Sequence, residues 1–172
     1  MLKLFGLGLI VIAGMLTGQL CFMQLESRYR DLESIRGGLR ALATEIDYSR
    51  KPLPVAWRDL AEIHDGAVSA MFERAADLFG SEGASTAGQA WVLSVRKCRE
   101  ELSLTAEDLR ILASLGPTLG ASGGSDQIRH LQAVDERLVG QMNEARDDSR
   151  RRGRLFRSLG LLGGILVAVV LA

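Results

Sequence analysis

The sequence predicts an all-α protein, an antiparallel six-helix bundle flanked by N- and C-terminal transmembrane helices. Two observations predict this class. Leu4–Met23 and Leu159–Ala172 contain no charged residue, although the whole chain is 24% charged with a formal net charge of zero. Between these ends, apolar residues recur at helical spacing and no strand alternation is found. The low aromatic content of 5% also disfavours a β-rich core.

The first predicted membrane helix occupies residues 1–24. Its 20 uncharged residues, Leu4–Met23, span ~30 Å at about 1.5 Å per residue, which is the thickness of the bilayer hydrocarbon. A cleaved signal peptide is the alternative, because Lys3 resembles a basic n-region. A retained helix is favoured, because the run is longer than a usual h-region and no small-residue cleavage motif follows it.

The second predicted membrane helix occupies residues 155–172. Its uncharged part, Leu159–Ala172, reaches only ~21 Å, so Leu155 and Phe156 must extend it. A buried C-terminal helix is the alternative, but such a helix is not normally apolar on all sides. Neighbouring arginines are predicted to contact lipid headgroups, and these are Arg150, Arg151, Arg152, Arg154 and Arg157. With Arg28 and Arg30, they place the central domain, residues 25–154, in the cytoplasm by the positive-inside rule.

The bundle begins with a long helix that continues the first membrane span. Its apolar residues follow a heptad pattern, namely Leu25, Leu32, Leu39 and Ile46 with Ile35 and Leu42 in the companion positions. The pair Gly37-Gly38 weakens this helix but allows another helix to approach closely. Pro52 and Pro54 end it and start the next helix.

Four more helices and a sixth that runs into the second span complete the predicted bundle. The second carries Trp57, Leu60, Ala61 and His64, and the third carries Val68, Met71, Phe72, Ala75, Leu78 and Phe79. A capping box at Thr86/Gln89 starts the fourth helix, whose apolar stripe is Trp91, Val95, Cys98 and Leu102. A capping box at Thr105/Asp108 starts the fifth, whose stripe is Leu109, Leu112 and Leu115. A kink is predicted at Gly116-Pro117. Ser125 or Asp126 caps the sixth helix, which has no stop signal before the second span and buries Ile128, Leu131, Leu138, Met142 and Ala145.

No catalytic constellation appears, so the sequence predicts a protein that is not an enzyme and uses no cofactor. Asp126 and His130 have a two-ligand spacing without a third ligand, so no metal site is assigned. Cys98 lies on an apolar stripe, and Glu107-Asp108 is interpreted as a negatively charged helix start. A regulatory sensor or scaffold that binds a small ligand is the main alternative, and a membrane-bound hydrolase is a third.

One segment suggests a docking surface. Glu45, Tyr48 and Arg50 place charges beside an aromatic ring at the end of the heptad pattern, which suits a polar interface with an aromatic anchor. The spacing of Glu45 and Tyr48 predicts that they share a helix face. A helix end with solvated charges explains the same residues.

Several blocks in chain order resemble the stage III sporulation protein AB family. They are Glu45-Ile46-x-Tyr48 with Pro52-Leu53-Pro54, Thr86-Ala87-x-x-Ala90-Trp91, Glu107-Asp108-Leu109-x-Ile111-Leu112, Gln127-x-x-His130-Leu131 and Arg157-Ser158-Leu159-Gly160. No single block is specific, but together they cover essentially the whole chain. Gly123 departs from the pattern, in which an acidic residue would follow Ser122.

The resemblance implies a membrane protein on the mother-cell side of an endospore-forming bacterium, needed after engulfment. It implies a component of the complex that links mother cell and forespore, similar to the platform proteins of type II secretion and type IV pilus machines. The implied partners are other stage III sporulation channel components, above all the secretion-type ATPase, stage III sporulation protein AA. Membrane lipids and a second copy of the chain are further expected partners, and nucleic acid is not.

Overall fold

The computed structural model describes the backbone of residues 26–49 and 51–171 and the side chains of residues 26–49 and 51–148. This part of the chain is helical, which confirms the predicted all-α class, and it contains no strand beyond one isolated bridge between Ser81 and Ala84. The chain divides into two compact units. Arg28–Asn143 is the helical bundle, and the other unit joins Met1–Ser27 to Glu144–Ala172.

The first helix, residues 26–44, ends in a π-helical turn, η1 (Glu45–Ser49). The predicted heptad pattern is confirmed here, because its central members are the most deeply buried residues of this helix. Leu32, Ile35, Leu39 and Leu42 are 0–1% exposed, and Ile46 packs partly buried against the same core. Burial of such a stripe is the main stabilising contribution that an amphipathic helix makes to a bundle.

Helices α2 (Leu53–Ile63) and α3 (Gly66–Leu78) form a hairpin. A proline in the first turn starts α2, as predicted, and Gly66 begins α3 at φ 67°, a backbone conformation that favours glycine. Phe79 was predicted to face inward, but it is 43% exposed. The reason is that α3 ends at Leu78 and Phe79 is already extended, so it leaves the helical periodicity.

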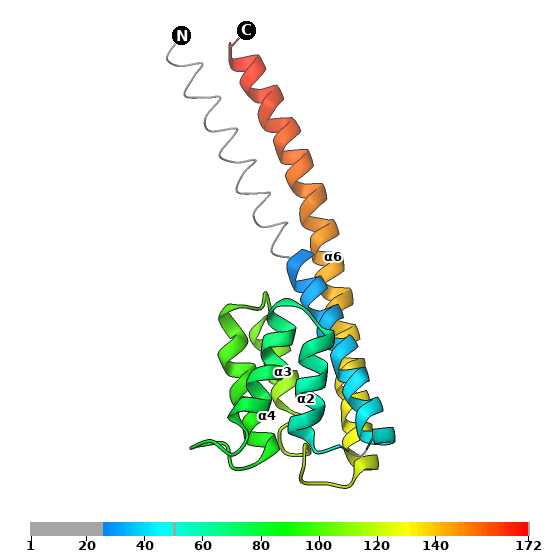
Figure 1. Cartoon of the computed structure of the whole chain (residues 1–172). Coiled ribbons are helices and arrows are strands. Elements are labelled where there is room, and N and C mark those ends of the chain that lie inside the picture. The colour runs from blue at the N-terminus through cyan, green and yellow to red at the C-terminus, as the bar shows by residue number, and fades with distance from the viewer. Residues whose placement is uncertain (1–25, 50, 172) are drawn as a thin grey trace. The chain divides into compact units, whose positions relative to one another are not determined.

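Helices α4 (Ala87–Lys97) and α5 (Ala106–Ala113) each begin with the predicted capping box, at Thr86/Gln89 and at Thr105/Asp108. A short 3₁₀ turn, η2 (Cys98–Glu100), follows α4. Figure 1 shows α2, α3 and α4 side by side, in agreement with the α2–α3 and α3–α4 contacts. The kink predicted at Gly116-Pro117 is absent, because α5 has already ended at Ala113 and turns follow it.

The last helix, α6 (Gly124–Leu171), runs without interruption, as its lack of a stop signal predicted. It starts earlier than predicted. Asp126 N donates to Gly123 O at 3.0 Å, so Ser125 and Asp126 lie inside the first turn instead of capping it. Gln127 fixes this start, because its amide nitrogen donates to Ser122 O at 2.9 Å and its amide oxygen accepts from Gly120 N at 3.2 Å.

Three aromatic rings form the centre of the core. The Trp57 and Trp91 ring centroids lie 6.1 Å apart, and those of Phe72 and Trp91 lie 5.9 Å apart. Trp91 Nε1 also donates to Leu112 O at 2.8 Å, which joins α4 to the end of α5. The predicted close approach at the glycine pair is confirmed, since a Cβ on Gly38 would lie 2.5 Å from Phe72 Cε2.

The two predicted membrane helices fall largely outside the described residues. Nothing of residues 1–24 is described, and residues 155–171 are part of α6 without described side chains. Among the residues that are described, no helix combines the length and apolar character that a bilayer crossing requires.

Candidate interaction surface

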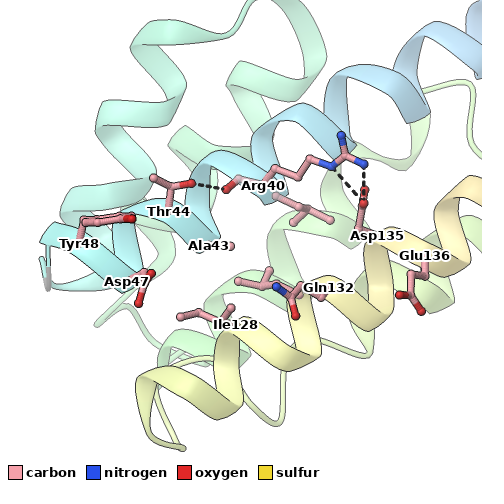
Figure 2. Close-up of a pocket in the computed structure, with 11 residues that line it drawn as sticks. Arg40, Ala43, Thr44, Asp47, Tyr48, Ile128, Gln132, Asp135 and Glu136 are labelled. Carbon is pink, nitrogen blue, oxygen red and sulfur yellow. Dashed lines mark hydrogen bonds and ion pairs between the residues drawn. The ribbon is translucent and has the colours of Figure 1, made fainter.

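A groove of about 430 Å³ lies between the end of the first helix and the start of α6. The two helices run antiparallel, because Arg28 Nη2 donates to Gln141 Oε1 at 2.8 Å whereas Arg36 Nε donates to Asp135 Oδ1 at 2.7 Å. The residues that line the groove are Leu39, Arg40, Ala43, Thr44, Asp47, Tyr48, Ile128, Leu131, Gln132, Asp135 and Glu136, most of which are labelled in Figure 2.

One carboxylate holds the two walls of this groove together. Asp135 accepts hydrogen bonds from Arg36 Nε at 2.7 Å and from Arg40 Nη2 at 2.9 Å (the Arg40 pair is drawn in Figure 2). Burial raises the pKa of the Asp135 carboxyl, but the hydrogen bonds from the two arginines outweigh burial, so its pKa lies below the ordinary value. Asp135 is therefore ionised and neutralised by cations on the opposite helix.

The other acidic groups of the groove are not neutralised in this way. Asp47 and Glu136 are exposed, and neither has an ion-pair partner among the described side chains. Figure 2 shows Asp47 on the first helix side and Glu136 further along α6. Beside Asp47 stands Tyr48, whose side chain is 83% exposed although it is aromatic. Tyrosine is enriched at protein-binding surfaces and among the residues that contribute most to binding.

The three residues predicted from the sequence as docking candidates have different surroundings. Tyr48 lines the groove, whereas a Glu45 carboxylate oxygen lies 3.7 Å from Lys51 Nζ. Glu45 and Tyr48 therefore do not share one set of neighbours, because the π-helical turn has more residues per turn than the α-helix assumed in the prediction. Arg50 lies outside the described residues, as do the side chains of Arg150, Arg151, Arg152, Arg154 and Arg157.

A second groove, of about 480 Å³, adjoins the first and shares Asp47 and Ile128 with it. Its other side includes Lys51, whose Nζ lies 2.7 Å from Asp59 Oδ2. A hydrogen bond from Lys51 to Asp59, and then the charges of Asp59 and Glu45, raise the pKa of the Lys51 ammonium. The positive charge of Lys51 is thus matched by Asp59 and Glu45, which leaves Asp47 as the unpaired charge among the described residues that line this second groove.

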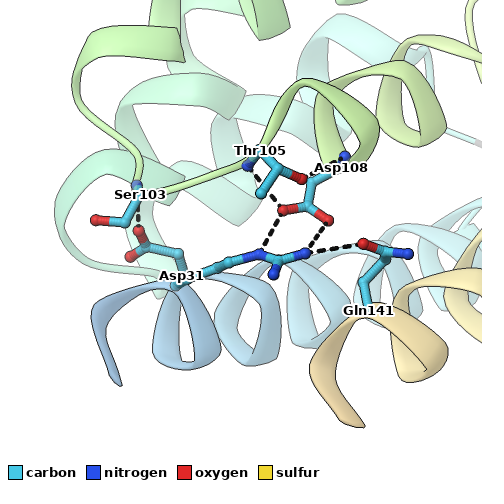
Figure 3. A network of polar contacts seen from close by, with 6 residues as sticks. Asp31, Ser103, Thr105, Asp108 and Gln141 are labelled. Atoms are coloured by element: carbon cyan, nitrogen blue, oxygen red, sulfur yellow. Dashed lines mark hydrogen bonds and ion pairs between the residues drawn. The ribbon is translucent and has the colours of Figure 1, made fainter. Parts of the chain in front are cut away.

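A buried polar network fastens the first helix to α5 and α6, as Figure 3 shows. Arg28 donates from Nε to Asp108 Oδ2 at 2.8 Å and from Nη2 to Asp108 Oδ1 at 3.0 Å, and also reaches Gln141. Asp108 is fully buried and Arg28 is 7% exposed. Asp108 thus lies in the first turn of α5, which confirms the predicted negatively charged helix start, but its carboxylate is buried. Arg28 faces the interior of the bundle.

The pKa values of this network follow from its contacts. Burial raises the pKa of the Asp108 carboxyl, but the hydrogen bonds from Arg28 and Thr105 outweigh burial and lower it overall. Asp31 behaves in the opposite way, because burial raises its pKa more than the Ser103 backbone N–H, at 2.7 Å from Oδ2, lowers it. The network stabilises the charges of Arg28 and Asp108 in the interior. Removal of either partner would leave the other charge buried and unpaired, which destabilises a fold.

The other side chains that could act in catalysis or metal binding are not grouped into one site among the described residues. Cys98 is a fully buried free cysteine, and burial raises the pKa of its thiol despite a contact from Arg74 Nη1 at 3.1 Å. Asp126 pairs with Arg129 at 3.2 Å, and His130 is exposed. Within the described part of the chain, no three His, Cys, Asp or Glu side chains are grouped to hold a metal ion.

Sequence reasoning missed the groove carboxylates and the interior pair. A weak signal existed for Asp108, because aspartate is the less usual partner in a capping box and here it has a second role. For Asp47 and Glu136 no local signal existed, because the first helix and α6 are separated in sequence by α2 to α5.

These features define a small all-α bundle protein in which charged side chains clamp the first helix to later ones. A family model described as Stage III sporulation protein AB matches residues 3–172, so the chain belongs to the stage III sporulation protein AB family. Stage III sporulation protein AB of Bacillus subtilis (strain 168) is 30% identical over 171 residues, 99% of each chain. A solved structure of stage III sporulation protein AB has a TM-score of 0.66 and 28% identity, and covers 72% of this chain and 97% of its own. The resemblance inferred from the sequence is confirmed, and with it a role in sporulation.

Proposed function

We propose that the chain is a non-enzymatic platform subunit of the complex that links mother cell and forespore, required for endospore formation after engulfment. Family membership supports the sporulation role, and the uncharged ends of the sequence support two membrane anchors. In this proposal the bundle faces the mother-cell cytoplasm, and the arginines next to the second anchor contact anionic headgroups.

The bundle's task in this proposal is to dock a partner, the secretion-type ATPase stage III sporulation protein AA, and to couple it to the membrane channel. The observation that carries the proposal is Tyr48, an 83% exposed aromatic residue on a π-helical turn that lines a groove. π-helical turns are rare and occur frequently at functional sites. A phenol ring that is 83% exposed contributes little packing to the fold of the bundle itself.

The absence of a catalytic role is part of the same proposal. It is supported by the surroundings of the reactive groups, since the Cys98 thiol is buried with a raised pKa whereas the His130 side chain is exposed. A buried thiol of raised pKa is a poor nucleophile.

The test is complementation in an endospore-forming bacterium that lacks its own family member. Tyr48→Ala and Glu45→Lys should each lower sporulation after engulfment at least about tenfold, and should reduce co-purification of the ATPase, while the protein stays at normal level in the membrane. Ile63→Ala is the matched control, because Ile63 is 73% exposed and lies outside the groove. Normal sporulation and full ATPase recovery with Tyr48→Ala and Glu45→Lys combined would overturn the proposal.

A further inference from the structure

The groove between the first helix and α6 is lined by two rows of residues that could contact one additional helix. One wall presents Arg40, Thr44 and Tyr48, each four residues after the previous one, and the other presents Ile128, Gln132 and Glu136 with the same spacing. Residues four apart on a helix stand in a row along one face. Each row spans eight residue steps, or about 12 Å at about 1.5 Å per step, which is about two turns of a third helix.

The charges of the groove select the type of helix that fits. Asp135 is neutralised by Arg36 and Arg40, at 2.7 and 2.9 Å, so it attracts no further cation. Asp47 and Glu136 remain, exposed and without an ion-pair partner among the described side chains. Arg36 and Arg40 exceed the charge of Asp135 by one, so Asp47 and Glu136 leave the described groove with one negative charge in excess. This excess favours a basic occupant over an anionic lipid headgroup.

The surface between the carboxylates is apolar in part. Ile128 and Ala43 are half-buried at the groove, and Tyr48 presents its ring at one end. Figure 2 shows Ile128 and Gln132 on α6 opposite Ala43 and Thr44. A ligand that fits this lining has apolar side chains along one stripe and basic side chains beside it, as in recognition of an amphipathic helix by a groove.

We propose that this groove binds an amphipathic basic helix of a partner protein, with its apolar stripe against Ile128 and Ala43 and Lys or Arg side chains on Asp47 and Glu136. The proposal rests on the docking function proposed above and names the kind of element that docks. A Lys or Arg close to Asp47 also lies beside the Tyr48 ring, where a cation–π contact adds to the ion pair.

Photo-crosslinking of the full chain in sporulating cells tests this. A photoreactive phenylalanine analogue at Gln132, in the middle of the groove, should give an adduct whose peptide comes from another protein. That peptide should be helical and amphipathic, with a Lys or Arg within one turn of the attachment point. The analogue at Glu62, an exposed residue of α2 outside the groove, is the control and should not give this adduct.

Charge variants make the test specific. Asp47→Lys combined with Glu136→Lys should reduce the Gln132 adduct about tenfold or more, because like charges would then face the partner. Asp47→Asn with Glu136→Gln, which preserves side-chain size, should reduce it less. Glu62→Lys should leave it unchanged.

The outcomes separate this proposal from the docking function itself. An adduct with a second copy of this chain, with lipid or with an acidic segment would overturn it, as would an adduct unaffected by the double lysine variant. Loss of ATPase recovery in Tyr48→Ala together with no protein adduct at Gln132 would keep the proposed function and discard the groove. Capture of a basic helix at Gln132, together with normal sporulation of Tyr48→Ala, would keep the groove proposal and discard the proposed function.

Discussion

Arg28 and Asp108 form a two-pronged ion pair in the interior of the bundle, with the guanidinium and carboxylate joined at 2.8 and 3.0 Å across 80 residues of sequence. Gln141 Oε1 accepts a further hydrogen bond from the same guanidinium, and Thr105 N donates to Asp108 Oδ2 at 2.8 Å. A single carboxylate thus caps α5 and anchors the first helix. This arrangement sets the position of the helix whose far end carries the groove.

Removal of one member of the pair should be costly. Asp108→Asn preserves the capping oxygen but leaves the Arg28 charge buried, so we expect a loss of about 3–5 kcal/mol in the free energy of unfolding. Arg28→Met in the same background should cost less than the sum of the two single changes, by about 1–3 kcal/mol, because the stranded charge is gone. Urea unfolding of the full chain in detergent, followed by helicity, measures this cycle. Strict additivity would show that the pair is not coupled.

Acid should weaken the bundle through its paired carboxylates. The pKa values of Asp108 and Asp135 are lowered in the folded state, so the unfolded chain binds more protons at acidic pH. Their contribution to stability is fully present above the ordinary aspartate pKa of about 3.9, and is lost as pH falls through the lower folded-state values. Asp31 opposes this in part, because its raised pKa favours protonation of the folded state.

The pH dependence can be assigned by substitution. Below about pH 4 to 5, the free energy of unfolding should rise with pH for the original chain and rise less for Asp108→Asn. Asp31→Asn should instead remove a fall in the free energy of unfolding that begins near pH 4, because the pKa of Asp31 is raised in the folded chain. Parallel curves for all three chains would mean that other groups control acid unfolding.

Local sequence signals predicted most of the helical elements. The Leu32, Ile35, Leu39 and Leu42 pattern and both capping boxes are properties of neighbouring residues, and the structure confirms them. Boundaries were less predictable where side chains from elsewhere decide them. The start of α6 depends on Gln127 bonding back to Ser122 and Gly120, which no capping rule includes.

The polar contacts between distant elements could not be predicted from spacing. Arg28 was interpreted only as a basic residue beside a membrane span, and Asp108 only as a helix-start acid, because nothing local indicates that they meet. The groove was likewise invisible, since its walls are 80 or more residues apart along the chain. The exposed position of Tyr48 followed from its place at a helix end, but its separation from Glu45 depends on a π-helical turn that has no simple sequence signature.

The proposed orientation can be tested with one thiol. Ser125→Cys, at an exposed position on α6, in a background without Cys21 and Cys98, should resist a membrane-impermeant thiol reagent in intact cells and react after lysis. A chain that retains only Cys98 should stay unreactive in both conditions, because that thiol is fully buried. Labelling of the Ser125→Cys variant before lysis would reverse the orientation.

Trp91 should be the most sensitive single position of the core. Its ring is fully buried between Trp57 and Phe72, so Trp91→Ala should lower the free energy of unfolding by about 3–5 kcal/mol. Trp91→Phe isolates the Nε1–Leu112 O hydrogen bond and should cost about 1–3 kcal/mol, since the Leu112 carbonyl loses its donor. Thermal unfolding of both variants distinguishes the two effects, and equal losses would assign the whole cost to the hydrogen bond.

The adjacent glycines of the first helix should respond in opposite directions to the same substitution. A Cβ on Gly38 would lie 2.5 Å from Phe72 Cε2, so Gly38→Ala must displace a ring held against Trp91. We expect it to lower the free energy of unfolding by about 1–3 kcal/mol. A Cβ on Gly37 would have its nearest neighbour, His64 Cε1, at 3.7 Å, an ordinary contact distance. Gly37→Ala should therefore stabilise the chain by up to about 1 kcal/mol, because alanine is the better helix former. Denaturant unfolding of the two variants side by side measures the difference, and stabilisation by Gly38→Ala would show that Phe72 can move without cost.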